Sequence, residues 1–331
     1  MQSFHLGTIK MSRLLARLIK QADMLNARLQ LKMRPRDEDV LVLYFHSVGL
    51  NRKSLLKVTA PGISIELQVL AEIIDCFYEL GYRTVTPNEL NDPCIPKKFL
   101  ITFDDGYANN QQALPILSSY NACMVCFVSG RNVEFEEAFW WDVLWRERSR
   151  RHQSIDKYTV EKDMLKTLTS KQIRDYLLQN FGLEALKPLG EDDSPMTVKE
   201  LQEFSRNKAI QIGNHTYDHE ILVNLDSENE LTTEITKNEQ FLDRCQIVHV
   251  PAISYPNGNC SASVVAAARA AGMSWGFTTA ANKYIGDNWT IGRFSISDDF
   301  PIRDQAIWCG ADFKFYDTLR IIYQKCRVSR I

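Results

Sequence analysis

Two short stretches of the chain hold side chains that could share a metal ion. The stretch ITFDDGYANN places Asp104 and Asp105 side by side after an apolar run, and QIGNHTYDH places His215 and His219 four residues apart. Two carboxylates in one pocket repel each other unless a cation or a shared proton relieves them. Two neutral imidazoles and one carboxylate, with open positions for water, are typical of a catalytic zinc or iron site.

Each stretch also has an ordinary structural interpretation. On one helical turn, where we expect His215 and His219, the rings share a face at roughly 5–6 Å between Cβ atoms, but such pairs also occur as surface residues. Asp-Asp-Gly alone is usually a turn. Because both stretches follow strand candidates, their joint occurrence favours the metal site, and the second carboxylate is then available as a base.

The elements that must position these residues alternate along the chain. Strands are predicted at 40–45, 82–86, 99–103, 123–128, 209–213, 248–254, 275–279 and 289–296, with helices near 65–80, 109–119, 197–207, 228–244 and 262–271. This alternation favours βαβ units and a parallel sheet. We therefore predict an α/β fold, a distorted (β/α) barrel of seven strands, whose chemistry lies at the C-terminal ends of the strands.

The paired aspartates need a departure from strand geometry, because neighbouring side chains on a strand point to opposite faces. If the strand ends at Phe103, Asp104 and Asp105 lie in the following loop, where this alternation no longer applies. Gly106 permits a sharp turn there. Both carboxylates can then face one cleft.

Three segments stand apart from the barrel, which we place at residues 38–300. Residues 139–194 are helical and charged in pattern, and we predict a helical insertion that forms a lid. Residues 1–37 form a basic amphipathic helix that could contact an anionic membrane or pack on the barrel with its basic face in solvent. Residues 1–36 carry a net charge of +7 and the rest of the chain −9. Residues 301–331 are expected to form a C-terminal helical tail.

The composition narrows the class of protein. The chain has 331 residues, 45% of them hydrophobic, and a net charge of −2, which gives no reason to propose a nucleic acid partner. The start lacks a signal peptide pattern, the eight cysteines lack a disulfide-like spacing, and no apolar run approaches about 20 residues. We expect a cytoplasmic protein, peripheral on the inner face of the cytoplasmic membrane if its N-terminal helix binds there.

TFDDGY, followed about a hundred residues later by HTYDH and then by SYPNG, resembles the polysaccharide deacetylases, carbohydrate esterase family 4. The resemblance covers about residues 38–300, and LYFH, FWWD and MTVKEL belong to it. It implies a hydrolase that uses a divalent metal, Zn²⁺ first and Co²⁺, Ni²⁺, Fe²⁺ or Mn²⁺ as alternatives, to remove an acyl group from an amino sugar. The acyl group is usually acetyl.

The resemblance also implies a role for individual residues. Asp105, His215 and His219 match the metal ligands, and Asp104 matches the general base that deprotonates the attacking water. The loop SYPNG is expected to stabilise the oxyanion with a backbone N–H around Tyr255. Candidates for substrate contacts are Tyr107, Asn214 and Pro256.

The sequence departs from the family pattern at two positions. The usual Arg-x-Pro-Tyr motif is replaced by ISYPNG, so Arg293 in IGRFSI is a candidate to orient the base, with a structural ion pair as the alternative. The late Leu-x-His motif is missing. Because His46 in LYFHSV follows the first predicted strand, the chain resembles the family branch in which an early histidine protonates the leaving amine. The alternative is that His46 is a strand-end histidine bonded to a backbone carbonyl.

The sequence therefore predicts an enzyme that removes an N-acyl group from an amino sugar, polymeric or lipid-linked, in the synthesis of cell-surface glycans. One alternative is a deformylase or another amide hydrolase that acts on a non-polymeric substrate, because catalytic residues define the reaction and not the substrate. A second alternative is an inactive barrel that only binds glycans. The intact set of Asp104, Asp105, His215 and His219 argues against that second alternative.

Overall fold

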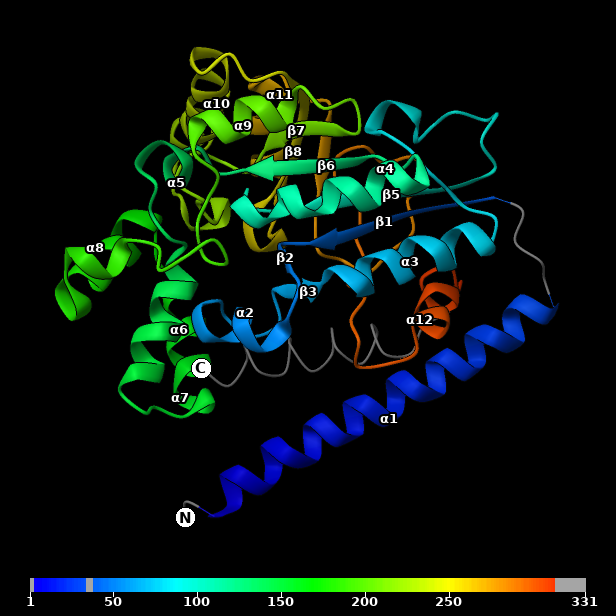
Figure 1. Ribbon diagram of the computed structural model, residues 1–331, viewed down its shortest axis with the longest axis horizontal. Helices are drawn as coiled ribbons and strands as arrows, with labels where there is room; N and C mark the ends of the chain where they lie inside the picture. The colour runs from blue at the N-terminus through cyan, green and yellow to red at the C-terminus, as the bar shows by residue number, and fades with distance from the viewer. Residues whose placement is uncertain (1–2, 34–37, 313–331) are drawn as a thin grey trace.

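The structure, a computed structural model, describes residues 3–33 and 38–312 (Figure 1). Its centre is a curled parallel sheet of seven strands, in the order β1-β5-β6-β7-β8-β9, with β4 paired to the beginning of β5. The strands are β1 (Asp39–Phe45), β4 (Arg83–Thr84), β5 (Lys97–Phe103), β6 (Met124–Val128), β7 (Ile210–Asn214), β8 (His249–Ser254) and β9 (Trp275–Phe277). The predicted (β/α) barrel is confirmed.

Alternation along the strands builds two layers of core. In β6, Met124, Cys126 and Val128 pack in the large cluster between the sheet and the helices, whereas Val125 and Phe127 pack in the barrel interior. All five side chains of β6 are buried. A strand buried on both faces requires an apolar residue at every position, which is why this run is continuously hydrophobic.

The segment at 289–296, predicted as a strand, forms two isolated bridges instead. Ile291 pairs with Phe277 of β9, and Phe294 pairs with Leu43 of β1. Between these two bridges, the Arg293 N–H donates to the Ala280 carbonyl at 2.8 Å. The segment therefore joins the last strand to the first without forming a regular ladder.

Helices cover the outside of the sheet close to the predicted positions. Those of the barrel are α3 (Leu67–Glu79), α4 (Leu114–Tyr120), α5 (Gly130–Phe135), α9 (Val198–Ser205), α10 (Glu228–Arg244) and α11 (Ala262–Ala270). Short 3-10 turns lie at Pro87–Glu89, Ala108–Ala113, Leu183–Leu186, Leu222–Asn224 and Pro256–Gly258. Thr197 caps α9 in a capping box with Glu200.

The predicted insertion folds as three helices, α6 (Trp140–Arg150), α7 (Ile155–Leu165) and α8 (Ser170–Phe181). They lie at the end of the sheet toward which the strands point (Figure 1). A small parallel sheet of β2 (Ser47–Gly49) and β3 (Ser64–Glu66), with α2 (Arg52–Val58), precedes the barrel helices in the chain. Helix α2 packs against α6.

The N-terminal helix α1 (Ser3–Met33) packs beside α12 (Ile302–Cys309), as Figure 1 shows. Met24 and Ala27 are buried in this contact, and Arg28 Nε donates to Asp304 Oδ1 at 2.7 Å. The expected tail at 301–331 is described only as far as residue 312, where α12 is its helical part, and the remainder of that prediction lies outside the described residues.

Candidate metal centre

Loops at the C-terminal ends of β1, β5 and β7 bring five predicted residues around one cavity. His46 follows β1, Asp104 and Asp105 follow β5, and His215 and His219 follow β7. All five line a cavity of about 100 Å³. Because the strands are parallel, residues far apart in sequence meet at this edge of the barrel.

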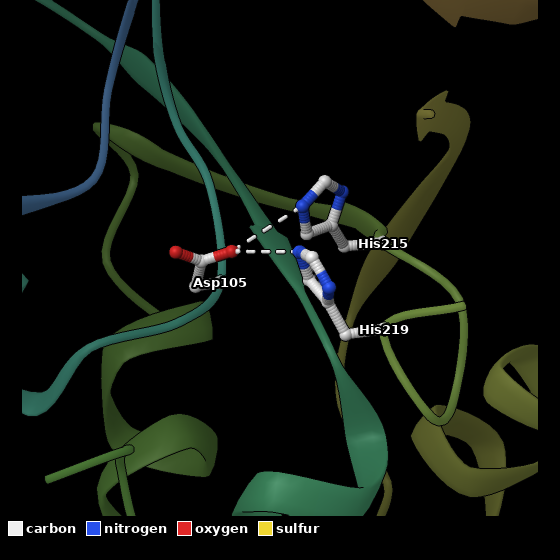
Figure 2. Close-up of side chains that lie close together, drawn as sticks. All are labelled: Asp105, His215 and His219. Atoms are coloured by element: carbon white, nitrogen blue, oxygen red, sulfur yellow. Dashed lines mark ion pairs between the residues drawn. The ribbon is translucent and has the colours of Figure 1, made fainter. Parts of the chain in front are cut away.

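Asp105, His215 and His219 form the centre of the site (Figure 2). The Nε2 atoms of His215 and His219 lie 3.3 and 3.4 Å from Asp105 Oδ1. One potential ligand atom from each residue lies within 4.8 Å of the others. The carboxylate is 1% exposed, so the cluster is shielded from bulk water.

The donor set fits a cation. Neither oxygen of Asp105 has a hydrogen-bond partner among the described residues. His215 Nδ1 lies 2.8 Å from the Ser254 carbonyl, so it carries the proton there and leaves the lone pair of Nε2 directed at Asp105. Two electron-rich atoms facing each other in a buried space repel unless a positive charge, a shared proton or a metal ion, lies between them. Nitrogen and carboxylate ligands of this kind suit zinc and related divalent metals.

The histidines do not lie on a helical turn, which corrects the expectation from their spacing. The segment after β7 is a loop, with Thr216 and His219 in the left-handed region at φ 60° and 51°. The loop is shaped by side chains: Asn214 Oδ1 accepts from the Thr216 N–H, and Thr216 Oγ1 accepts from the Glu220 N–H, both at 2.8 Å. These local bonds compete with helix formation and direct both rings to one side.

Asp104 is held by Arg293. The guanidinium donates to both carboxylate oxygens at 2.8 Å, and both side chains are buried. Arg293 also donates to the hydroxyls of Thr102 (3.1 Å) and Ser254 (2.9 Å) and to the Thr278 carbonyl (2.9 Å). A bidentate pair fixes the carboxylate in orientation as well as in charge.

The two aspartates remain ionised despite burial. Burial by itself raises the pKa of Asp104, but Arg293 outweighs it and the net pKa lies below the usual value. The pKa of Asp105 is also lowered, because His215 and His219 outweigh its burial. Burial lowers the pKa of His46, although both carboxylates oppose this shift.

Two predicted substrate contacts are buried away from the cavity. Tyr107 is 0% exposed, and its hydroxyl donates to Asp142 Oδ2 at 2.6 Å and accepts from Trp141 Nε1 at 2.9 Å. Asn214 is also 0% exposed and shapes the histidine loop. Neither side chain lines the cavity, so the structure places them in support of the site rather than at a substrate wall.

In the loop SYPNG, the residue that lines the cavity is Asn257. The Tyr255 N–H already donates to the Phe277 carbonyl at 3.0 Å, and Tyr255 and Pro256 are buried. Asn257 adopts φ 59°. The expected oxyanion donor at Tyr255 is therefore engaged in the sheet. Asparagine tolerates left-handed backbone, so an Asn-Gly pair is the sequence signal that could have located this turn.

The insertion contributes a wall that sequence reasoning did not assign. Trp140, Trp141, Tyr158, Lys162 and Lys166 line the cavity. The Trp141 ring lies 4.6 Å from the His219 ring, between their centroids. The aromatic run FWW at the beginning of the insertion is the sequence signal for this wall.

Comparisons with known proteins agree on one family. The sequence model of the polysaccharide deacetylase family matches residues 92–183 and 189–276. A putative polysaccharide deacetylase, YxkH of Bacillus subtilis, is 29% identical over 142 residues, which are 40% of this chain and 46% of that relative. The chain thus spans less than half the length of this curated relative.

Solved structures show the same fold. The deacetylase PplD of Streptococcus pyogenes, in complex with acetate, superposes with a TM-score of 0.55 at 15% identity, over 81% of this chain and 96% of that one. IcaB from Ammonifex degensii gives a TM-score of 0.55 at 19% identity, over 83% of this chain and 98% of that one.

Proposed function

Because the chain belongs to the polysaccharide deacetylase family, we propose that it is a metal-dependent hydrolase that removes an N-acyl group, most often acetyl, from an amino sugar. The observation that carries this proposal is the pair of buried, ionised aspartates in one cavity with two histidines. Both oxygens of Asp104 accept hydrogen bonds from Arg293, whereas neither oxygen of Asp105 accepts one from the described residues. This difference supports Asp104 as the general base and Asp105 as a metal ligand.

Asp104 acts as the general base. Its carboxylate is held by Arg293 in one orientation, and its lowered pKa keeps it ionised near neutral pH. It accepts the proton of the attacking water. Arg293 is a positioning residue, because it acts through Asp104.

Asp105, His215 and His219 would hold the metal, with Zn²⁺ first among the candidates. When bound, the ion supplies Lewis acidity, which lowers the pKa of water and polarises the amide carbonyl. The Ser254 carbonyl fixes the tautomer of His215 by accepting from Nδ1, so its Nε2 is available as a ligand atom.

Two further steps fall to other residues of the cavity. His46 donates the proton to the leaving amine, which its place in the same cavity as Asp104 supports. The backbone N–H of Asn257 replaces that of Tyr255 as the proposed donor to the oxyanion, because Asn257 lines the cavity.

Amine release from N-acetylated chito-oligosaccharides and from lipid-linked amino sugars tests the proposal. The assay compares zinc-loaded protein, chelator-treated protein, and the zinc-loaded Asp104→Asn and His46→Gln variants. We expect full release only from the zinc-loaded wild type, and release reduced about 10²-fold or more in the Asp104→Asn and His46→Gln variants. Release that survives both the chelator and Asp104→Asn contradicts the mechanism. A protein that binds these saccharides and releases nothing is a glycan-binding barrel, and release of formate from N-formyl substrates alone identifies a deformylase.

We further propose that α1 contacts an anionic membrane, at the inner face of the cytoplasmic membrane. Leu18, Leu25 and Leu29 are 53%, 60% and 60% exposed, on the side of α1 away from the buried Met24 and Ala27. Arg28 and Lys32 are also exposed. Apolar residues flanked by cations are typical of helices that lie in a membrane interface. Among residues 3–33 and 38–312, none of the helices has the length and hydropathy that a membrane crossing requires.

Sedimentation with liposomes tests this contact. The wild type is compared with a Leu18→Gln/Leu25→Gln/Leu29→Gln variant, which keeps the contact with α12, on vesicles with and without anionic lipid. We expect binding to anionic vesicles only, and its loss in the variant. Equal binding by the variant removes the basis for the proposal.

A further inference from the structure

Helix α7 of the insertion brings two lysines to the catalytic cavity. Lys162 lies in the last turn of α7, and Lys166, four residues later, is its C-cap, so the two side chains lie on the same side of the helix end. Both line the cavity that also contains Asp104, Asp105 and His46. Two cationic side chains therefore reach the place where the proposed substrate must lie.

These lysines have no carboxylate partner in an ion pair within the described part of the chain. Lys166 Nζ donates to Asn257 Oδ1 at 2.5 Å, and Lys162 Nζ lies 5.3 Å from the centre of the Tyr158 ring. In contrast, Lys171 and Lys187 of the same insertion pair with Asp175 and Glu184 at 2.8 Å. A partly buried cation without a counter-charge is costly, which indicates that the charge has another use.

The pKa values of both lysines are lowered, as expected for cations that no nearby carboxylate neutralises. Burial, and then the charge of Lys162, lower the pKa of Lys166 to about 8, while Asp163 opposes the shift. Burial also lowers the pKa of Lys162, against the effects of Asp163 and Asp142. Asp142 is already occupied, because its carboxyl accepts from the Ala60 N–H and the Tyr107 hydroxyl.

The lysines are held in place by bonds to the loop that carries His219. The Asn224 side chain donates to the carbonyls of Lys166 and Leu168, both at 2.9 Å. The Ser170 N–H donates at 2.8 Å to the carboxylate of Glu220, which is the residue after His219. The end of α7 is therefore fixed relative to the histidine cluster, and the lysines need little reorganisation to bind a ligand.

We propose that Lys162 and Lys166 form a subsite for an anionic group, a phosphate or a carboxylate, carried by the N-acyl amino sugar substrate. This inference rests on the proposed function, and it narrows the substrate class to saccharides with a negative charge near the scissile amide. The cavity of about 100 Å³ is smaller than the roughly 300–1,000 Å³ of pockets that enclose a whole ligand. It therefore admits the acyl end of the substrate, while the charged group lies against the lysines at the wall.

The test measures binding by calorimetry with the full chain and three probes: N-acetylglucosamine 1-phosphate, N-acetylmuramic acid and neutral N-acetylglucosamine. The variants are Lys162→Gln and Lys166→Gln. Lys157→Gln is the matched control, because Lys157 is an exposed lysine on the same helix. We expect at least one anionic probe to bind more tightly than the neutral sugar, and each cavity variant to lose about 10-fold or more of that affinity. The control should bind like the wild type.

The same titrations identify the anion and separate the two proposals. Tighter binding of the phosphate or of the carboxylate probe indicates which group the subsite takes, and affinity should fall as salt is raised. Anionic probes that bind no better than the neutral sugar, or that bind both cavity variants as well as the wild type, overturn this inference. Because binding is read without turnover, lysine-dependent binding by a protein that hydrolyses no amide would reject the proposed function and retain the subsite.

Discussion

Asp104 and Asp105 are neighbours in sequence and equally buried, yet their surroundings are opposite. Asp104 receives two hydrogen bonds from Arg293 and one at 3.3 Å from the Ser254 hydroxyl. Asp105 receives none from the described residues and faces two imidazoles. Burying a carboxylate costs free energy unless a partner compensates it. The protein supplies that partner for Asp104, whereas the site around Asp105 is complete only with a cation.

This difference begins in the backbone. Asp104 still has its N–H in the ladder with the Phe45 carbonyl at 2.9 Å, whereas Asp105 adopts φ 78° and is followed by Gly106 at φ 90°. The turn between the two residues directs one carboxylate to the base position and the other to the histidines. The left-handed backbone at Asp105 thus separates the functions of two residues that are adjacent in the sequence.

Replacing Asp105 with Asn should have the largest effect. The variant should lose zinc and fall to the activity of chelator-treated wild type, because the buried anion that attracts the cation is removed. Zinc at 100 times its Kd should stabilise the wild type by about 2.7 kcal/mol and leave the variant unchanged. Thermal unfolding with and without zinc measures this, and a zinc-stabilised variant would contradict the ligand assignment.

Asp104→Asn should show the reverse pattern. Activity should fall about 10²–10⁴-fold, because the general base is lost. The variant should retain zinc, and its metal-free form should be less stable than the wild type, since Arg293 keeps its buried charge without a carboxylate. Metal content, kcat and denaturant unfolding of the two asparagine variants, each the control for the other, test the comparison. Equal loss of zinc in both variants would contradict the assignment of separate roles to Asp104 and Asp105.

Arg293→Lys should have an intermediate effect, about 10- to 100-fold on kcat. Lysine keeps the charge but cannot make the two parallel bonds to Asp104 while also donating to Thr102 and Ser254. Because Arg293 does not line the cavity, KM should change little. Steady-state kinetics separate the two parameters. A loss confined to KM would show that Arg293 does not act through the base.

Ser254→Ala should have the smallest effect, about 2- to 10-fold on kcat. The variant removes one hydrogen bond to Asp104 and one from Arg293 but retains the backbone carbonyl that orients His215. Zinc content should therefore stay at the wild-type level. Metal analysis alongside kinetics checks this, and zinc loss would mean that the hydroxyl supports the ligand side of the site.

The positions of most elements could be predicted from the sequence. Apolar runs located six of the predicted strands, and helical patterning located α10, whose bounds Glu228–Arg244 match the prediction. The predicted strand at 82–86 shrinks to Arg83–Thr84 because it pairs with only two residues of β5. The segment at 289–296 has strand-like residues, but its partners change from β9 to β1, which no local pattern reveals.

The sequence by itself determined the chemical types of the site: two adjacent carboxylates, two histidines four residues apart and the strands that precede them. Only the tertiary structure decided their partners. Arg293 reaches Asp104 from 189 residues away, Asn257 rather than Tyr255 faces the cavity, and α7 brings Lys162 and Lys166 to the catalytic wall. The physical reason is that local pattern reports which face of an element is buried, whereas the contacts of a polar side chain depend on how the barrel closes.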